Sequence, residues 1–189
     1  MTKFAVIDTE TTWSNEVMSI GIVISDDESF SVLEKKYWII EPTCEEGGMF
    51  SSTLMLKGTK PKRCTREKAI SDIRQLLNKH GTVTLCAYNA SFDRNHLPEM
   101  HDMEWLDIIK VAAYKQHNKY LPKRAEYCGT GRLRSGYGVE EMMHHITKTW
   151  NYSEKHNAVT DAEDELKIME LLGRDIQYYR AAQAVQRGC

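Results

Sequence analysis

Hydrophobic and polar positions along the chain separate short apolar runs from longer stretches with helical spacing. The first run, Phe4-Ala5-Val6-Ile7, has no polar face to turn to solvent, which is typical of a central strand covered on both sides. The pattern predicts strands over 3–9, 17–25, 30–40 and 82–87, with residues 26–29 turning the second strand into the third. It predicts helices over 66–79, 89–97, 107–117, 137–149, 158–172 and 174–186.

The order of these elements predicts the fold class. Three hairpin-linked strands come first, and helices alternate with a strand after them. This order is typical of an α/β protein with a mixed sheet flanked by helices on both faces. A chain of 189 residues is long enough for a sizeable core and favours a single domain. We therefore expect one domain over 1–189, with a core over 3–173 and a C-terminal helix within 174–187 that serves packing or a subunit contact.

Composition limits the cellular setting. The five cysteines are scattered and form no Cys-x-x-Cys pair, so we interpret them as reduced thiols of a cytoplasmic protein and not as zinc ligands or disulfides. The chain has no apolar stretch long enough to cross a bilayer, and its first residues do not form a signal peptide. We therefore expect no membrane partner.

Positive charge is concentrated in one part of the chain. The formal net charge is −2, yet residues 110–134 contain seven lysines and arginines and only one acid, Glu126. The segment ends in the glycine-containing stretch 129–136, which resembles a mobile loop or hairpin. Arg132 and Arg134 are candidates for contacts with the phosphates of a single strand. An ordinary solvated surface explains the same pattern equally well.

Two carboxylates stand at the end of the first apolar run. Side chains alternate along a strand, so Asp8 and Glu10 share one face and lie about 6.6 Å apart along the chain. Two acids at the exit of a buried strand repel each other unless a cation lies between them. The alternative is a strand that simply emerges into water at Asp8.

A third acid and a histidine lie near the end of the chain. Apolar residues recur at helical spacing from residue 158 to residue 172. This helix can begin with Asn157 as its cap, or with Thr160 and Glu163 as a capping box. In either case Asp161 lies in the first turns and His156 lies outside, so His156 can reach the same site only from a loop. An ordinary surface histidine is the alternative.

The middle segment adds a fourth acid. Asn89 and Asp93 are four residues apart, and on the predicted helix they share a face. Phe92 is interpreted as a core residue in preference to a platform for a base. The three segments together offer four carboxylates and one imidazole, the groups that a site with two divalent ions needs to hydrolyse a phosphodiester.

The three segments resemble the motifs of one enzyme family. Asp8-x-Glu10, Asn89-x-x-Phe92-Asp93 and His156-x-x-x-x-Asp161 are similar in order and spacing to those of the DEDDh 3′–5′ exonucleases. That superfamily includes the proofreading subunit of bacterial replicative polymerase, ribonuclease T and oligoribonuclease. The resemblance covers residues 3–173. The branch with tyrosine in place of histidine would carry tyrosine at position 157, where this chain has asparagine.

The resemblance implies a fold, an activity and roles for the five polar residues. It implies a ribonuclease H-like fold and a metal-dependent 3′–5′ exonuclease that uses two Mg²⁺ or Mn²⁺ ions. Asp8, Glu10 and Asp161 would bind the first ion, Asp8 would bridge to the second, and Asp93 would reach the second directly or through water. His156 would be the general base that deprotonates the attacking water.

The residues that would hold the substrate match the family less closely than the acidic motifs do. Many relatives have a glycine and an aliphatic residue after the first motif, where this chain has Thr11-Thr12-Trp13. Trp13 is interpreted as a stacking residue for the terminal base or as a core tryptophan. Our candidates for substrate contacts are Thr9, Thr11, Thr12, Trp13, Asn89, Phe92, Arg132 and Arg134.

Two functions from different classes remain. The first is an exonuclease acting on the 3′ ends of single-stranded DNA or RNA, and the second is a non-catalytic docking module with the same fold. The presence of all five polar residues favours the enzyme. Nothing in the sequence distinguishes DNA from RNA, and the resemblance leaves open a homodimer and a polymerase or repair partner.

Overall fold

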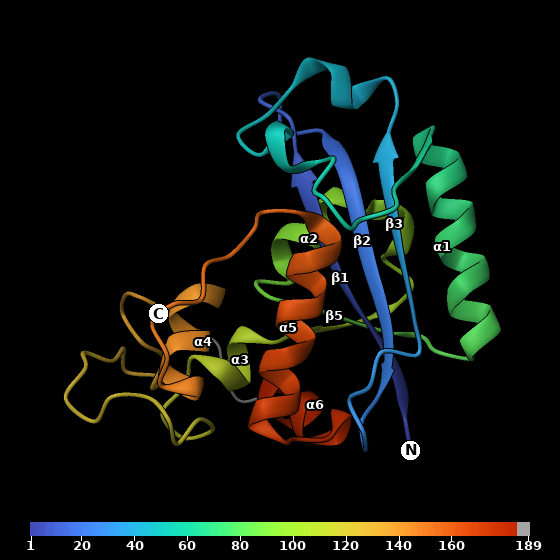
Figure 1. Cartoon of the computed structure of the whole chain (residues 1–189). Helices are drawn as coiled ribbons and strands as arrows, with labels where there is room; N and C mark the ends of the chain where they lie inside the picture. The colour runs from blue at the N-terminus through green and yellow to red at the C-terminus, as the bar shows by residue number, and fades with distance from the viewer. Residues whose placement is uncertain (185–189) are drawn as a thin grey trace.

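A computed structural model of the chain describes residues 1–184. Its centre is a six-stranded sheet in the order β4-β3-β2-β1-β5-β6 (Figure 1). The strands are β1 (Lys3–Thr11), β2 (Val17–Asp26), β3 (Glu34–Ile40), β4 (Lys62–Cys64), β5 (Thr84–Ala87) and β6 (Glu104–Asp107). The helices are α1 (Arg66–His80), α2 (Ser91–His96), α3 (Ile109–Ala112), α4 (Val139–Thr147), α5 (Ala158–Leu172) and α6 (Ile176–Ala184), with 3-10 turns η1 (Thr43–Glu46), η2 (Ser51–Thr53) and η3 (Pro98–Met100).

The sheet is mixed, as predicted. β1 pairs antiparallel with β2 and parallel with β5, and β2 pairs antiparallel with β3. The apolar run of β1 is buried on both faces, because Phe4 and Val6 join one core cluster while Ala5 and Ile7 join the other. This division of side chains is the alternation expected of a central strand.

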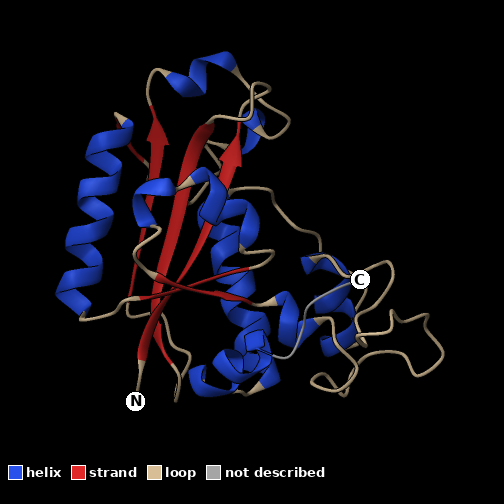
Figure 2. Ribbon diagram, turned by 180° about the vertical axis from the view of Figure 1, so that it is seen from behind, coloured by secondary structure: helices blue, strands red, loops and turns tan. Residues whose placement is uncertain are grey.

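Helices cover both faces of the sheet. Residues of α3, α4, α5 and α6 share the cluster of Phe4 and Val6, whereas α1 and the residues that border α2 share the cluster of Ala5 and Ile7. Figure 2 shows the sheet from behind, with helices in front of it and beyond it. The predicted α/β class with helices on both faces is confirmed.

A glycine brings α5 close to the sheet. A Cβ atom at Gly21 of β2 would lie 2.2 Å from the carbonyl carbon of Ala158, at the start of α5. The absence of a side chain at Gly21 therefore allows the first turn of α5 to lie directly on β2. This contact places Asp161 above the neighbouring strand β1.

Several predicted boundaries are wrong. β4 and β6 were not predicted, since strands of three and four residues are too short for a recognisable alternation. The helix expected over 107–117 is limited to Ile109–Ala112, and the helix expected from residue 89 begins at Ser91. The third strand begins at Glu34, after Phe30 adopts a positive φ of 52°.

The segment between α3 and α4 is largely irregular. It contains the isolated bridges Tyr114↔Arg132 and Tyr127↔Leu133, and Leu121 and Leu133 anchor it in the core. Cys128 in this segment is disulfide-bonded, so the prediction that all cysteines are reduced thiols is wrong there.

The end of the chain is described through α6. The predicted helix over 174–186 begins at Ile176, and residues 185–187 of that prediction lie outside the described residues. Within residues 1–184, no helix has the length and apolar character needed to cross a membrane.

Candidate active site

Three predicted metal ligands lie together at the junction of β1 and α5. Asp8, Glu10 and Asp161 each offer a carboxylate oxygen, and these three oxygens lie within 4.8 Å of one another. Asp8 and Glu10 come from the same face of β1, and Asp161 comes from the first turn of α5. A separation of this size allows a single cation to contact all three acids.

The start of α5 is fixed by Asn157. Its backbone carbonyl accepts hydrogen bonds from the amides of Thr160 at 2.8 Å and Asp161 at 2.9 Å. Its side-chain amide donates to the carbonyl of Thr53 at 2.7 Å and to the hydroxyl of Tyr37 at 3.1 Å. The alternative capping box is not formed, because the helix already begins at Ala158 and the hydroxyl of Thr160 donates to the carbonyl of Asn157 at 2.9 Å. Glu163 instead forms an ion pair with Lys35 of β3 at 2.6 Å.

The fourth acid lies beside this group of three. Asp93 is 2% exposed, and its Oδ1 accepts a hydrogen bond from the hydroxyl of Thr9 at 2.8 Å. Asp93 is near enough to Asp8 to raise the pKa of that carboxyl group. The structure therefore brings all four predicted carboxylates together. Asp93 lies adjacent to the group formed by Asp8, Glu10 and Asp161.

The electrostatics of the site favour a bound cation. Burial raises the pKa of Asp8 well above its usual range, and Asp93 and Glu165 raise it further. The Oδ2 atom of Asp8 is buried and has no hydrogen-bond partner among the described residues. Burial, followed by the charge of Asp161, raises the pKa of Glu10 to about 8. A divalent cation would relieve this repulsion and stabilise the ionised carboxylates.

The remaining two acids show the same effect. Burial raises the pKa of Asp93 to about 7, although the hydroxyl of Thr9 acts in the opposite direction. Burial and the charge of Glu154 raise the pKa of Asp161 to about 7. Four carboxylates with raised pKa values in one place are typical of a functional site.

Two further acids of the site were not predicted. Glu165 is 2% exposed, lies one helical turn after Asp161, and accepts a hydrogen bond from the amide of Tyr88 at 3.0 Å. Glu165 falls among the apolar positions of α5, and an acid at such a position could have identified it as a site residue from the sequence. Glu154 precedes α5 and has a pKa that burial raises to about 7. Its irregular segment carries no pattern that could have identified it.

His156 lies at the edge of the acidic group. One of its ring nitrogens and one carboxylate oxygen each of Glu154 and Asp161 lie within 4.8 Å of one another. The imidazole stacks on Phe50 with ring centroids 4.1 Å apart, and its backbone carbonyl accepts a hydrogen bond from the hydroxyl of Thr53. His156 has a φ of 53°, outside the helix as predicted. Its ring is therefore held beside the carboxylates by packing.

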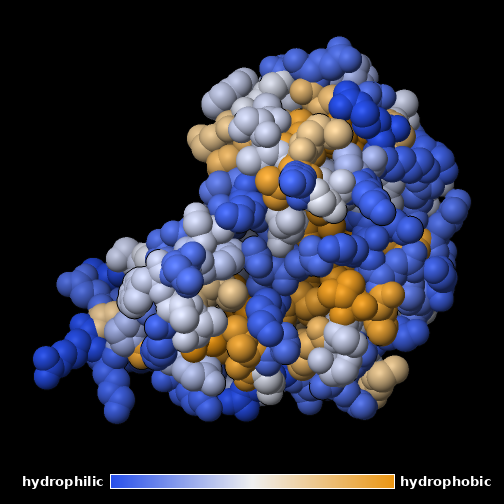
Figure 3. All heavy atoms as spheres, viewed as in Figure 1, coloured by the Kyte–Doolittle hydropathy of each residue, from blue (hydrophilic) through white to orange (hydrophobic). Residues whose placement is uncertain are grey.

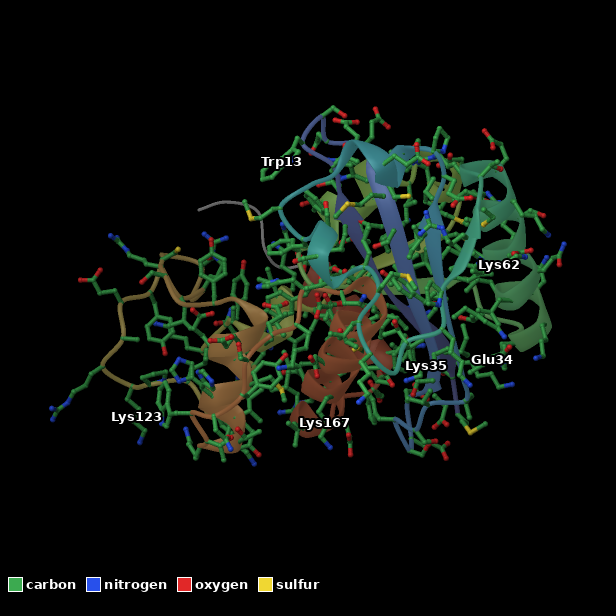
Figure 4. All side chains as sticks on the ribbon, turned by 45° about the horizontal axis from the view of Figure 1, so that its top comes forward. Trp13, Glu34, Lys35, Lys62, Lys123 and Lys167 are labelled. Atoms are coloured by element: carbon green, nitrogen blue, oxygen red, sulfur yellow. The ribbon has the colours of Figure 1, made fainter. Side chains whose placement is uncertain are left out.

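The residues after Glu10 form a turn beside the site. Trp13 is 70% exposed, which excludes the core interpretation (Figure 4). Thr9 and Thr12 are buried, and the hydroxyl of Thr12 lies 3.0 Å from that of Ser14. The pairing of β1 with β2 is irregular between Glu10 and Thr11, which marks the end of the regular strand.

The middle motif is placed differently from its prediction. Asn89 has a φ of 65° and precedes α2, so it does not share a helix face with Asp93. The backbone N–H of Asn89 donates a hydrogen bond to Oδ1 of Asp107 at 3.1 Å. Phe92 is 38% exposed and packs against His96, so the interpretation of Phe92 as a core residue is wrong.

Arg132 and Arg134, the two residues predicted to contact phosphates, lie in different environments. Arg132 and Asn89 line a small cavity of about 290 Å³ that also includes Lys110 and Tyr137. The guanidinium of Arg132 lies 4.8 Å from the centroid of the Tyr137 ring, and its buried Nε has no hydrogen-bond partner among the described residues. Arg134 is exposed and does not line this cavity.

Comparison with known proteins shows the fold. No family model and no curated protein sequence matches the chain. The nuclease domain of 3′hExo, a DEDDh family member bound to rAMP, superposes with a TM-score of 0.62 and 11% identity over 90% of this chain and 91% of its own. The chain has the fold of the DEDDh 3′–5′ exonucleases.

Other solved structures with this fold are longer. A 3′-exonuclease in a study of the 3′-end-specific recognition of a histone mRNA stem-loop superposes with a TM-score of 0.64 and 13% identity. The match covers 90% of this chain and 63% of that protein. Escherichia coli exonuclease I, in complex with an oligonucleotide, superposes with a TM-score of 0.58 and 16% identity over 97% of this chain and 42% of its own.

Proposed function

We propose that this chain is a metal-dependent 3′–5′ exonuclease that hydrolyses phosphodiester bonds at the 3′ ends of single-stranded DNA or RNA. The observation that carries the proposal is the convergence of Asp8, Glu10 and Asp161 oxygens within 4.8 Å, next to His156. The shared fold adds support, because the structural neighbours are 3′-exonucleases and an exonuclease in complex with an oligonucleotide.

The residues of the site fit two divalent cations. Carboxylate oxygens are the ligands that Mg²⁺ and Mn²⁺ prefer, and the unpartnered Oδ2 of Asp8 is the kind of atom that such an ion satisfies. Asp8, Glu10 and Asp161 would hold one ion, and Asp8 and Asp93 would hold the other. When bound, such ions lower the pKa of water and stabilise negative charge at the reacting phosphate.

His156 is the proposed general base. Imidazole titrates near neutral pH, so it can accept the proton of the attacking water and release it again. The stack on Phe50 keeps the ring in place, within reach of the carboxylates of Glu154 and Asp161. His156 thus stores the proton during the reaction.

The surrounding residues would position the 3′ end. The exposed rings of Trp13 and Phe92 lie beside the first and second motifs and would stack on bases. Arg132 would contact a phosphate and Asn89 a polar group of the nucleotide, since both line the same small cavity. The remaining candidates, Thr9, Thr11, Thr12 and Arg134, stay predictions.

A nuclease assay tests the proposal. Purified protein is incubated with matched single-stranded DNA and RNA oligonucleotides labelled at the 5′ end, with Mg²⁺, Mn²⁺ or EDTA. The expected products form a ladder that shortens from the 3′ end, and EDTA abolishes it. A 3′-terminal phosphorothioate should slow the first step. Tight binding without degradation under any metal condition would instead favour the non-catalytic module.

A further inference from the structure

A second candidate binding site lies beside the carboxylates, on the face of α5 that carries Val159, Thr160 and Glu163. A groove of about 980 Å³ runs between α5, β3 and α1, and residues 57–60 of the segment between η2 and β4 also line it. In Figure 1 this segment crosses β3 between the two helices. We call it the lysine groove, and six lysines line it: Lys35, Lys36, Lys57, Lys60, Lys62 and Lys79.

The charge of the lysine groove differs from that of the whole chain. Three acids line it (Glu34, Asp72 and Glu163), so six positive and three negative charges leave a net charge of +3. The formal net charge of the protein is −2. In Figure 4, Lys35, Glu34 and Lys62 lie on the side of the molecule away from Lys123. The positive charge is thus local, and it would attract a polyanion.

Ion pairs account for four of the six lysines. Lys35 binds Glu163 at 2.6 Å, Lys62 binds Asp72 at 2.5 Å, and Lys79 binds Glu34 at 2.6 Å. Lys36 shares Glu34 at 3.3 Å, so these pairs tie β3 to α1 and α5. Within residues 1–184, Lys57 and Lys60 take part in no ion pair, and both are exposed. Structural ion pairing therefore does not explain Lys57 and Lys60.

The chemistry of the lining favours contact with a phosphate backbone. The aromatic side chains of the groove, Tyr37 and Trp38, are only 4% and 2% exposed, so neither offers a free face to a base. A lysine ammonium group is a point charge that binds phosphate without reading base edges. Figure 3, which views the face with α5 in front, shows a hydrophobic patch in its lower centre with hydrophilic residues around it. Binding in the groove would be independent of sequence.

The groove begins next to the carboxylates. Thr160 lines it, and the hydroxyl of Thr160 lies 3.5 Å from the Oδ1 of Asp161. Val159 also lines the groove, so the first turn of α5 separates the two sites. A strand whose 3′ end lies at the carboxylates would pass over the half-buried Thr160 to reach the lysines.

We propose that the lysine groove binds the sugar-phosphate backbone of the substrate strand, several nucleotides 5′ of the end that is cleaved. This inference rests on the proposed exonuclease function. The groove adds affinity for long strands, and short substrates occupy only the carboxylate site.

Binding and turnover measurements with a double variant test the proposal. Lys57→Gln with Lys60→Gln removes two charges that make no ion pair. Each single-strand phosphate contact changes affinity by about fivefold at 0.1 M salt, so the Kd for an oligonucleotide of about 20 nucleotides should rise by about 5- to 25-fold. The slope of log K against log salt should become shallower by about 1.4. Fluorescence anisotropy in EDTA measures both, and turnover of a dinucleotide should stay unchanged.

A matched control removes the same charge elsewhere. Lys148→Gln with Arg174→Gln changes two exposed cations that do not line the groove. Circular dichroism and melting temperature establish that both double variants fold. An unchanged Kd and salt slope in the groove variant would overturn the proposal, as would an equal loss in the control or a loss of dinucleotide turnover. If the parent protein binds the long strand but degrades nothing, the exonuclease function fails while the groove is still tested by the loss of binding.

Discussion

The carboxylates of Asp8, Glu10 and Asp161 reach one position from two elements that are distant in sequence. Alternation along β1 predicted that Asp8 and Glu10 share a face, and helical spacing predicted Asp161 in the first turn of α5. The exposure of Trp13 and Phe92 could not be predicted in this way, because aromatic residues are usually buried. Their exposure depends on the turn after β1 and on the short α2, which only the folded chain defines.

Removing charge from the carboxylates should abolish activity. Asp8→Asn, Glu10→Gln and Asp161→Asn should each lower turnover by about 10²-fold or more, because each removes a ligand for a cation that stabilises the transition state. Each variant should remain folded, since loss of repulsion favours the metal-free protein. Calorimetric titration with Mn²⁺ measures binding, and Glu163→Gln is the control on the same helix. Undiminished Mn²⁺ binding in all three variants would remove the metal assignment.

Replacement of His156 should separate catalysis from metal binding. His156→Ala should lower turnover by about 10²- to 10⁴-fold, the usual contribution of a positioned general base. The acidic limb of the pH–rate profile should flatten, while the affinity for Mn²⁺ stays close to that of the parent. Phe50→Leu serves as a comparison, because it removes the aromatic stack and keeps the imidazole. A collapse of Mn²⁺ affinity in His156→Ala would show that His156 is a ligand.

At the scale of elements, the long apolar segments were predictable and the short ones were not. The stretch over Ala158–Leu172 has helical spacing throughout, and its predicted boundaries agree with α5. β4 and β6 exist because they pair with β3 and β5, not because of a pattern of their own. α3 ends at Ala112, where tertiary contacts of the following segment replace the helix.

The contact between α5 and β2 should tolerate no side chain. Gly21→Ala would place a methyl group 2.2 Å from the backbone of Ala158, so the start of α5 must move. We expect a loss of stability of about 1–3 kcal/mol or more and a loss of turnover, because Asp161 moves with the helix. Gly129→Ala is the control, since no atom lies within 4 Å of its added Cβ. Thermal unfolding and nuclease activity measure both effects. Equal behaviour of the two variants would contradict this role of Gly21.

At the scale of the whole molecule, the order of elements was sufficient to predict the mixed sheet and its helices on both faces. The lysine groove was not predictable, because its lysines come from β3, β4, α1 and the segment before β4. No periodicity relates them along the chain. The basic segment 110–134, which the sequence does emphasise, contributes Arg132 to a different cavity.

Metal-free protein should lose stability as pH rises. The pKa of Glu10 is raised to about 8, so the folded state binds more protons than the unfolded state between about pH 4.3 and pH 8. Stability should therefore fall through this window in EDTA and level off above it. Mg²⁺ at pH 8 should restore the melting temperature, since the ion binds the ionised carboxylates of the folded protein. Scanning fluorimetry from pH 5 to pH 8.5 measures the effect, and Glu10→Gln should reduce the slope. A melting temperature that rises with pH in EDTA would contradict this account.

The stack of His156 on Phe50 makes the proposed reaction sensitive to heat. Phe50 is only partly buried, and of residues 43–60 only Gly48 and Leu54 are buried. Segments with few buried apolar contacts open before the whole protein unfolds. Activity should therefore decline with warming while the sheet is still folded, and the temperature of half-activity should lie below the melting temperature. Amide exchange over residues 43–60 should rise in the same temperature interval.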